Sequence, residues 1–313
     1  MSQHIRNCLF ALLSLVLLIS LLSCSPPKAI ETKYPIEITD QLGRVVKLDK
    51  IPQRIISLAP SNTEILFALG LAERVVGVTD YCNYPPEAEQ KDSIGGFSTP
   101  NIEKVVALSP DLVVATSIHQ KQVIPNLVQK GITVFALAPK TLDEVLEAIT
   151  LIGKITGKEE EASGLVAEMS NKIKAVTDET ASLSPEQRPR VFYITWQEPL
   201  KTAGAGTLHD ELIQKAGGTN VARDLTGYAA ITLEAVIEAN PEVMIAGVGM
   251  GTGADAPLQF ALTEPRLENT DARQHNRVYD IDVDLVGRAG PRIVEALEQF
   301  AQYIHPELFE GSQ

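Results

Sequence analysis

The sequence predicts an α/β protein made of two similar lobes, each built on a parallel sheet and connected to the other by a single long helix. Short apolar runs alternate with amphipathic stretches over residues 40–157 and again over 185–313. The stretch "NIEKVVALSPDLVVA" (101–115) nearly recurs 131 residues later as "ITLEAVIEANPEVMIA" (231–246). Between the two halves, residues 158–184 form a charged, periodic segment that is typical of a helix. We therefore expect an N-terminal lobe, a connecting helix and a C-terminal lobe with these boundaries.

The N-terminal lobe (40–157) is predicted from short apolar strands that alternate with helices. The strands are "RIISLAP" (54–60), "RVVGVTD" (74–80), "DLVVAT" (111–116) and "TVFALAP" (133–139). Apolar strands separated by helices form parallel sheets that are covered on both faces. In the helix expected after the first strand, Ser61 and Glu64 have the spacing of a capping box, which would satisfy free N–H groups of the first turn.

The C-terminal lobe (185–313) repeats this order. Its strands are "RVFYITW" (190–196), "EVMIAG" (242–247) and "RVYDIDVD" (277–284), and a last helix is expected from about Pro291. Thr207 and Asp210 again have capping-box spacing at the start of a helix. The connecting helix would be a rod of about 40 Å, because each residue adds about 1.5 Å. A rigid rod between two lobes predicts a cleft that cannot close far.

The N-terminus predicts export and lipid attachment. Arg6 precedes a 14-residue apolar run that ends at Leu22, which is too short to span a bilayer and fits the core of an export signal. Ser23 before Cys24 is similar to the cleavage box of bacterial lipoproteins. We therefore expect a signal peptide at 1–23, a lipid on Cys24 and a tether over 24–39. Ordinary secretion, with Cys24 unmodified, is the alternative.

Composition and residue pattern exclude several classes of function. The net charge of −13 argues against nucleic-acid binding, which needs an excess of Lys and Arg. The five histidines are scattered without ligand spacing, so no metal site is expected. No serine lies in a G-x-S-x-G elbow, and no other nucleophile is visible. The sequence therefore predicts a protein that is not an enzyme and has no resident cofactor.

Several motifs, taken together, resemble a known family. "RIISLAPSNTEILFALG", "YCNYPPEA", "NIEKVVALSPDLVVA" and "GRAGPR" occur in the order found in the binding proteins that serve ABC importers of cobalamin and iron complexes. The resemblance spans about Gln41 to Tyr303. It implies two Rossmann-like lobes joined by one long helix, with the ligand in the cleft between them. It also implies a permease dimer with ATPase subunits as partner, and a place on the outer face of the cytoplasmic membrane, in the periplasm where an outer membrane exists.

The resemblance is greatest to the cobalamin-binding branch of this family. Tyr81, Phe97 and Tyr228 stand where that branch has aromatic side chains, and Asp284 matches an acid that accepts a hydrogen bond from the ligand. The only tryptophan, Trp196, also lies near a predicted strand end, where open α/β sheets bind ligands. A corrinoid is a wide disc fringed with amides, so it needs flat aromatic faces and a few polar groups. These five residues are the predicted ligand site, although each aromatic could instead fill the core.

Three other functions remain open. A ferric siderophore or a haem is the alternative ligand class within the family, because Tyr81 or Tyr228 could bind haem iron. An anionic siderophore would favour cations, but Arg288 is the only basic residue among the positions singled out and could instead anchor the last helix. An exported metallocofactor enzyme is less favoured because the sequence shows no ligand cluster. An adhesin or scaffold is disfavoured by the duplicated glutamates.

Those glutamates are Glu103 and Glu234, which open the two copies of the repeated element. A carboxylate in the first turn of a helix is favoured by the helix dipole, by about 0.3–1 kcal/mol, so each could be explained singly. The dipole does not explain why both copies keep the acid. A permease of two identical subunits presents one surface twice. The resemblance implies that these residues pair with permease arginines, and we expect them to dock the two lobes.

Overall fold

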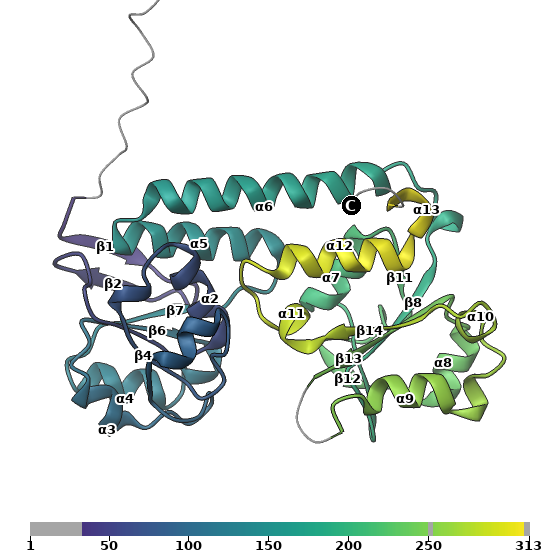
Figure 1. Cartoon of the computed structure of the whole chain (residues 1–313), viewed down its shortest axis with the longest axis horizontal. Helices are drawn as coiled ribbons and strands as arrows, with labels where there is room; N and C mark the ends of the chain where they lie inside the picture. Colours follow the sequence, from purple (N-terminus) through teal and green to yellow (C-terminus); the bar gives the residue numbers. More distant parts are fainter. Residues whose placement is uncertain (1–32, 250–252, 310–313) are drawn as a thin grey trace, which may run out of the picture. The chain divides into compact units, whose positions relative to one another are not determined.

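The computed structural model describes residues 33–249 and 253–309 (Figure 1). These residues fall within one compact unit, Thr32–Gln313. The predicted signal peptide, Cys24 and most of the predicted tether lie outside the described residues. Within the described ranges, no helix is both long and apolar enough to cross a membrane.

The N-terminal lobe contains a parallel sheet, as predicted, and this sheet has a fifth strand, β5, in addition to the four expected from the sequence. The strand order is β5-β4-β3-β6-β7, with all four pairings parallel. The strands are β3 (Ile55–Ser57), β4 (Val75–Val78), β5 (Asp92–Ser93), β6 (Leu112–Thr116) and β7 (Val134–Leu137). The α-helices are α2 (Pro60–Ala68), α3 (Ile102–Ala107), α4 (Val123–Gln129) and α5 (Leu142–Thr156), with 3-10 turns η1 (Ala72–Arg74), η2 (Pro86–Gln90) and η3 (Ser117–His119). Short buried strands between helices give this doubly covered sheet.

The C-terminal lobe contains a four-stranded parallel sheet with the order β11-β8-β13-β14. Its strands are β8 (Arg190–Ile194), β11 (Thr219–Asn220), β13 (Val243–Val248) and β14 (Val278–Asp282). Its helices are α7 (Leu208–Lys215), α8 (Leu233–Ala239), α9 (Ala256–Thr263), α10 (Asp271–Gln274), α11 (Val283–Gly287), α12 (Ile293–Ile304) and α13 (Pro306–Phe309), with 3-10 turns η4 (Pro185–Gln187) and η5 (Pro265–Leu267). The sequence did not predict a second, antiparallel sheet, β12 (Tyr228–Ala230), β10 (Leu200–Ala203) and β9 (Trp196–Gln197).

One long helix, α6 (Glu159–Thr180), joins the lobes inside the predicted range 158–184. Its 22 residues correspond to about 33 Å. Ala162, Met169 and Val176 recur every seven residues on its buried face. This face packs on α5 from the first lobe and on α12 from the second, as Figure 1 shows. The largest apolar cluster accordingly includes core residues of both lobes, such as Ile65 and Phe300.

The structure corrects three details of the sequence analysis. Ile36–Thr39, predicted as the end of the tether, form strand β1, which pairs with β2 (Val45–Leu48) in an antiparallel hairpin. Helix α2 begins at Pro60 after Ala59, whose side chain makes no cap, so the Ser61/Glu64 capping box is wrong. Thr207 does cap α7 by accepting from the Asp210 N–H, but the Asp210 carboxylate turns to Asn220 and Gln214.

Candidate functional site

The loop after β4 presents Tyr81 to solvent. The Tyr81 side chain is 62% exposed, whereas the next residue, Cys82, is buried at 3%. The Cys82 sulfur lies 3.1 Å from the Thr63 hydroxyl and 3.2 Å from the Thr79 hydroxyl. Cys82 therefore fixes the loop from inside and leaves the Tyr81 ring exposed to solvent.

Asp284 lies beside this loop although it is 203 residues away in the sequence. It follows β14 at the start of α11, where the Asp282 carboxylate accepts a hydrogen bond from the Asp284 N–H at 2.8 Å. The Asp284 carboxylate accepts from Arg288 Nη2 at 2.5 Å and from Asn83 Nδ2 at 3.3 Å. The Asn83 contact crosses from one lobe to the other. The structure thus brings together two of the predicted ligand residues, Tyr81 and Asp284.

The buried carboxylate of Glu64, on α2, binds the same arginine as Asp284. It accepts from Arg288 Nη1 at 3.1 Å, and from Arg292 Nε at 3.0 Å and Nη2 at 2.7 Å. The hydrogen bonds that Arg292 donates to Glu64 raise the pKa of Arg292. Arg292 also lies 3.8 Å above the centre of the Tyr84 ring, a cation–π contact. Glu64, which the sequence analysis assigned to a helix cap, is instead the anchor of an ion network between the lobes.

Tyr228 and Trp196 lie on the small antiparallel sheet. Lys201 pairs with Trp196 on one side and with Ala230 on the other, and Tyr228 is two residues from Ala230. Directly opposed residues share a face of an antiparallel sheet, and so do residues two apart along a strand. Trp196 and Tyr228 therefore project from the same face. Trp196 Nε1 donates to the Glu198 carbonyl at 2.8 Å, which orients the indole.

Tyr228 is exposed at its ring and anchored at its hydroxyl. The side chain is 61% exposed, and the hydroxyl lies 3.0 Å from Nδ1 of buried His209. Burial lowers the pKa of His209 to about 4, so the imidazole is neutral at pH 7. Burial also raises the pKa of Tyr228. The ring is therefore held in one orientation by a neutral, buried partner.

Phe97 is less exposed than Tyr81 and Tyr228. It is half-buried, and its ring meets His119 edge to face at 5.7 Å. His119 is fully buried; its Nδ1 accepts from the Thr116 N–H at 3.0 Å and its Nε2 donates to the Phe97 carbonyl at 2.7 Å. Burial lowers the pKa of His119, in agreement with this neutral tautomer. Among the contacts of the described residues, none joins Phe97 to the other four.

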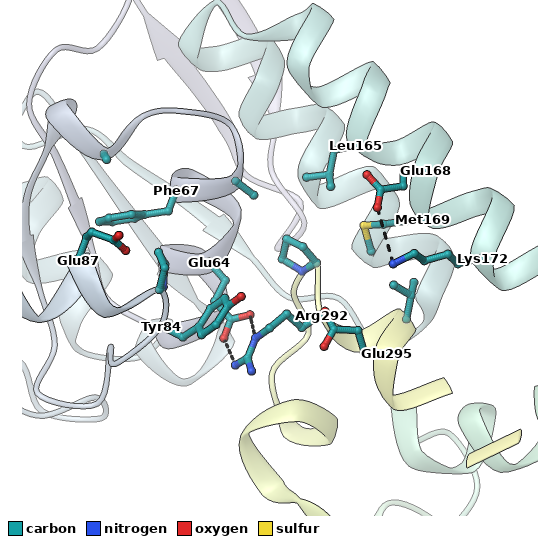
Figure 2. Close-up of a pocket in the computed structure, with 15 residues that line it drawn as sticks. Glu64, Phe67, Tyr84, Glu87, Leu165, Glu168, Met169, Lys172, Arg292 and Glu295 are labelled. Atoms are coloured by element: carbon teal, nitrogen blue, oxygen red, sulfur yellow. Dashed lines mark hydrogen bonds and ion pairs between the residues drawn. The ribbon is translucent and has the colours of Figure 1, made fainter. Parts of the chain in front are cut away.

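Figure 2 shows a cavity of about 580 Å³ on the side of the network that faces α6. Its apolar walls include Phe67, Leu165 and Met169, and Glu64 and Arg292 line it as an ion pair. None of the five predicted ligand residues lines this cavity. It is therefore distinct from the positions of Tyr81 and Asp284 and from the sheet face that carries Trp196 and Tyr228.

The interlobe contacts were not predicted, although the sequence contains a signal for them. Glu64 precedes Gly70 by six residues, and Glu211 precedes Gly217 by the same interval. In the structure, Glu211 Oε2 accepts from the Leu142 N–H at the start of α5, at 2.8 Å. Glu64 accepts instead from the side chain of Arg292, the residue just before α12. In each lobe the glutamate six residues before a glycine thus binds the start of a helix of the other lobe.

Glu103 and Glu234 each lie in the first turn of a helix, as predicted. Asn101 caps α3 and Thr232 caps α8, each accepting from the N–H three residues later. Both glutamates are exposed, so they are not part of the hydrophobic core. The two helices differ in one respect, because Glu234 lies 3.6 Å from Arg266.

Comparisons with known proteins place this fold in a family. The family model described as "Periplasmic binding protein" matches residues 55–285. The chain is 34% identical over 287 residues, 88% of each chain, to the "Uncharacterized ABC transporter substrate-binding lipoprotein YvrC" of Bacillus subtilis. It is 32% identical to the "Cobalamin-binding protein" of Halobacterium salinarum, over 87% of this chain and 74% of the relative.

Two solved structures share the fold. The periplasmic vitamin B12 binding protein BtuF of Vibrio cholerae has a TM-score of 0.69 at 27% identity, over 83% of this chain and 98% of its own. The periplasmic heme-binding protein RhuT from Roseiflexus sp. RS-1 has a TM-score of 0.72 at 26% identity, over 83% and 99%. Members of this family are extracytoplasmic transport binding proteins rather than enzymes. The chain belongs to the periplasmic binding protein family, has the class III binding protein fold, and is a substrate-binding protein of the ABC-importer type.

Proposed function

We propose that this protein captures a cobalamin-type corrinoid outside the cytoplasm and delivers it to an ABC importer. The observation that carries the proposal is the pair of exposed rings, Tyr81 and Tyr228, the second anchored at its hydroxyl, together with a carboxylate, Asp284, close to the first. Flat rings suit the face of a corrin disc, and a carboxylate suits the amides at its edge. The names of the Halobacterium and Vibrio relatives support the same ligand class.

Haem is the second candidate, supported by the similarity to the Roseiflexus protein and by the tyrosine hydroxyls as possible iron ligands. Haem propionates are anionic and favour cations in the site. The two arginines nearest the predicted site, Arg288 and Arg292, are already paired with Glu64 and Asp284. These two arginines therefore offer no free charge to a propionate, whereas Lys201, exposed on the face that carries Trp196 and Tyr228, is a cation close to the predicted rings.

The ligand site is tested by removing its rings. Tyr81→Ala and Tyr228→Ala should each weaken corrinoid binding by about 1–3 kcal/mol, or about 5- to 150-fold, because each loses a stacking face. Tyr81→Phe keeps the ring and should retain most of the affinity. Isothermal titration calorimetry with cyanocobalamin gives the comparison. Unchanged affinity in both alanine variants would show that the rings do not contact the ligand.

We further propose that Glu103 and Glu234 dock the two lobes on a two-fold permease dimer with its ATPase subunits, and that a lipid on Cys24 tethers the protein to the outer face of the cytoplasmic membrane. The duplicated position and exposure of the glutamates support docking. The lipoprotein name of the Bacillus relative supports the anchor. Ligand capture thus takes place close to the permease.

A further inference from the structure

We infer that four charged residues, Glu64, Asp284, Arg288 and Arg292, set the charge selectivity of the ligand site and adapt it to a neutral, amide-bearing ligand. This inference rests on the proposed function. We refer to these residues as the charge cluster. Within it, the buried members neutralise the one carboxylate that a ligand can reach.

The charge cluster contains two carboxylates and two guanidinium groups, so its net charge is zero. Its ion pairs join Arg288 to Glu64 at 3.1 Å, Arg292 to Glu64 at 2.7 Å and Arg288 to Asp284 at 2.5 Å. The Glu64 and Arg288 side chains are 2% and 9% exposed, whereas Asp284 is 40% exposed. Water screens the buried charges poorly, so loss of one member leaves an uncompensated charge that attracts or repels a charged ligand.

Asp284 is the member that faces a ligand. Among the described residues, its carboxylate accepts from Arg288 and Asn83 on the same oxygen, Oδ2. The other oxygen, Oδ1, is left as an acceptor for an N–H donor. Because Arg288 offsets the charge of this carboxylate, the donor need not be a cation. A neutral amide, of the kind that fringes a corrinoid, fits this acceptor.

The same arginines hold the backbone of the loop that carries Tyr81 close to Asp284. Arg288 Nη2 lies 3.4 Å from the Tyr81 carbonyl, and Arg292 lies over the Tyr84 ring. The loop of the first lobe is thus bound at Tyr81, Asn83 and Tyr84 by one segment of the second lobe. Selectivity and positioning therefore depend on the same side chains. Loss of positioning should weaken every ligand alike, whereas loss of charge balance should favour ligands of one sign.

The experiment measures affinities for three corrinoids that differ in charge at one side chain: cyanocobalamin, a monocarboxylate derivative and an aminoethylamide derivative. The readout is the ratio of the dissociation constants for the cationic and anionic probes. Glu64→Gln gives the cluster a charge of +1 and should shift this ratio at least tenfold toward the anionic probe. Arg288→Gln gives it −1 and should shift the ratio at least tenfold toward the cationic probe.

Matched controls separate local from general charge effects. Glu87→Gln and Arg223→Gln change the charge equally at exposed positions outside the cluster and should leave the ratio within about twofold of the wild-type value, because water screens exposed charges. Asp284→Asn changes the half-exposed member and should shift the ratio in the same direction as Glu64→Gln, so the test does not depend on one buried substitution. The thermal midpoint of each variant is measured in parallel.

The outcomes distinguish a failure of the corrinoid proposal from a failure of the inference about charge selectivity. Wild-type protein that binds none of the three probes would refute the corrinoid proposal and this inference with it. Wild-type binding with ratios that stay unchanged in the Glu64, Arg288 and Asp284 variants would refute the inference alone. A uniform loss of affinity for all three probes would also overturn it, because that result shows positioning without charge selection.

Discussion

Replacing Glu103 and Glu234 together by Ala should abolish most transport and leave ligand binding intact. Each carboxylate is exposed in the first turn of a helix, where the dipole accounts for about 0.3–1 kcal/mol of stability. The double variant should therefore unfold only slightly more easily. Removing one partner of an interface charge pair costs about 2–5 kcal/mol. The loss of about 2 kcal/mol at one lobe alone therefore corresponds to about 30-fold weaker binding to the permease.

The structure also predicts that the two single variants differ. Glu234 has a competing partner in Arg266 at 3.6 Å, with both side chains more than half exposed. To bind a permease cation, Glu234 has to leave this pair, whereas the described contacts give Glu103 no ion pair to break. Glu103→Ala should thus reduce docking more than Glu234→Ala, and Arg266→Ala should strengthen docking.

The assay compares ligand affinity by calorimetry with transport by the permease complex in proteoliposomes. Glu238→Ala is the matched control, because Glu238 is an exposed acid on the same helix as Glu234, one turn further along. It should transport normally. If the double variant also transports at the wild-type rate, the two glutamates act as helix caps only and the docking argument is wrong.

The remaining predictions concern the buried side chain of His209 and the proposed lipid anchor on Cys24. Burial lowers the pKa of His209 from 6.5 to about 4, so in this window the unfolded chain binds a proton that the folded chain does not. Stability should therefore fall as the pH falls from 6.5 toward 4, and His209→Gln should flatten this dependence in urea titrations; an unchanged slope would show that His209 is not its source. Cys24→Ala should move the protein from the membrane fraction to the soluble fraction on cell fractionation, or block processing. Retention in the membrane fraction after normal cleavage would place the tether elsewhere.

The two parallel sheets and the long helix could be predicted because their signals are local. Val113, Val114 and Ala115 are consecutive and all buried, as a strand covered on both faces requires. Met169 and Val176 repeat at helical spacing on the buried face of α6. Each of these patterns lies within one short segment of the sequence. Periodicity therefore predicted the architecture without tertiary information.

The interlobe network could not be predicted because its partners are far apart in the sequence. Glu64 and Arg292 are 228 residues apart, and the spacing of Ser61 and Glu64 also fits a local cap. The local interpretation was wrong because the helix begins at Pro60, which moves the N-cap two residues earlier, from Ser61 to Ala59, and because the buried Glu64 carboxylate binds the arginines. The small sheet that carries Trp196 and Tyr228 was missed for a similar reason, since β9 and β12 have two and three residues.

The central claim, a corrinoid as ligand, is tested most directly by calorimetric titration of the protein without residues 1–23 against cyanocobalamin, haem and several ferric siderophores. If a corrinoid is the ligand, one cyanocobalamin should bind per chain, and haem and the anionic siderophores should bind more weakly or not at all. Tyr81→Ala and Tyr228→Ala should also lower the cyanocobalamin affinity in the same assay. Saturable binding of haem or a ferric siderophore, with no heat from cyanocobalamin at micromolar protein, would contradict the claim.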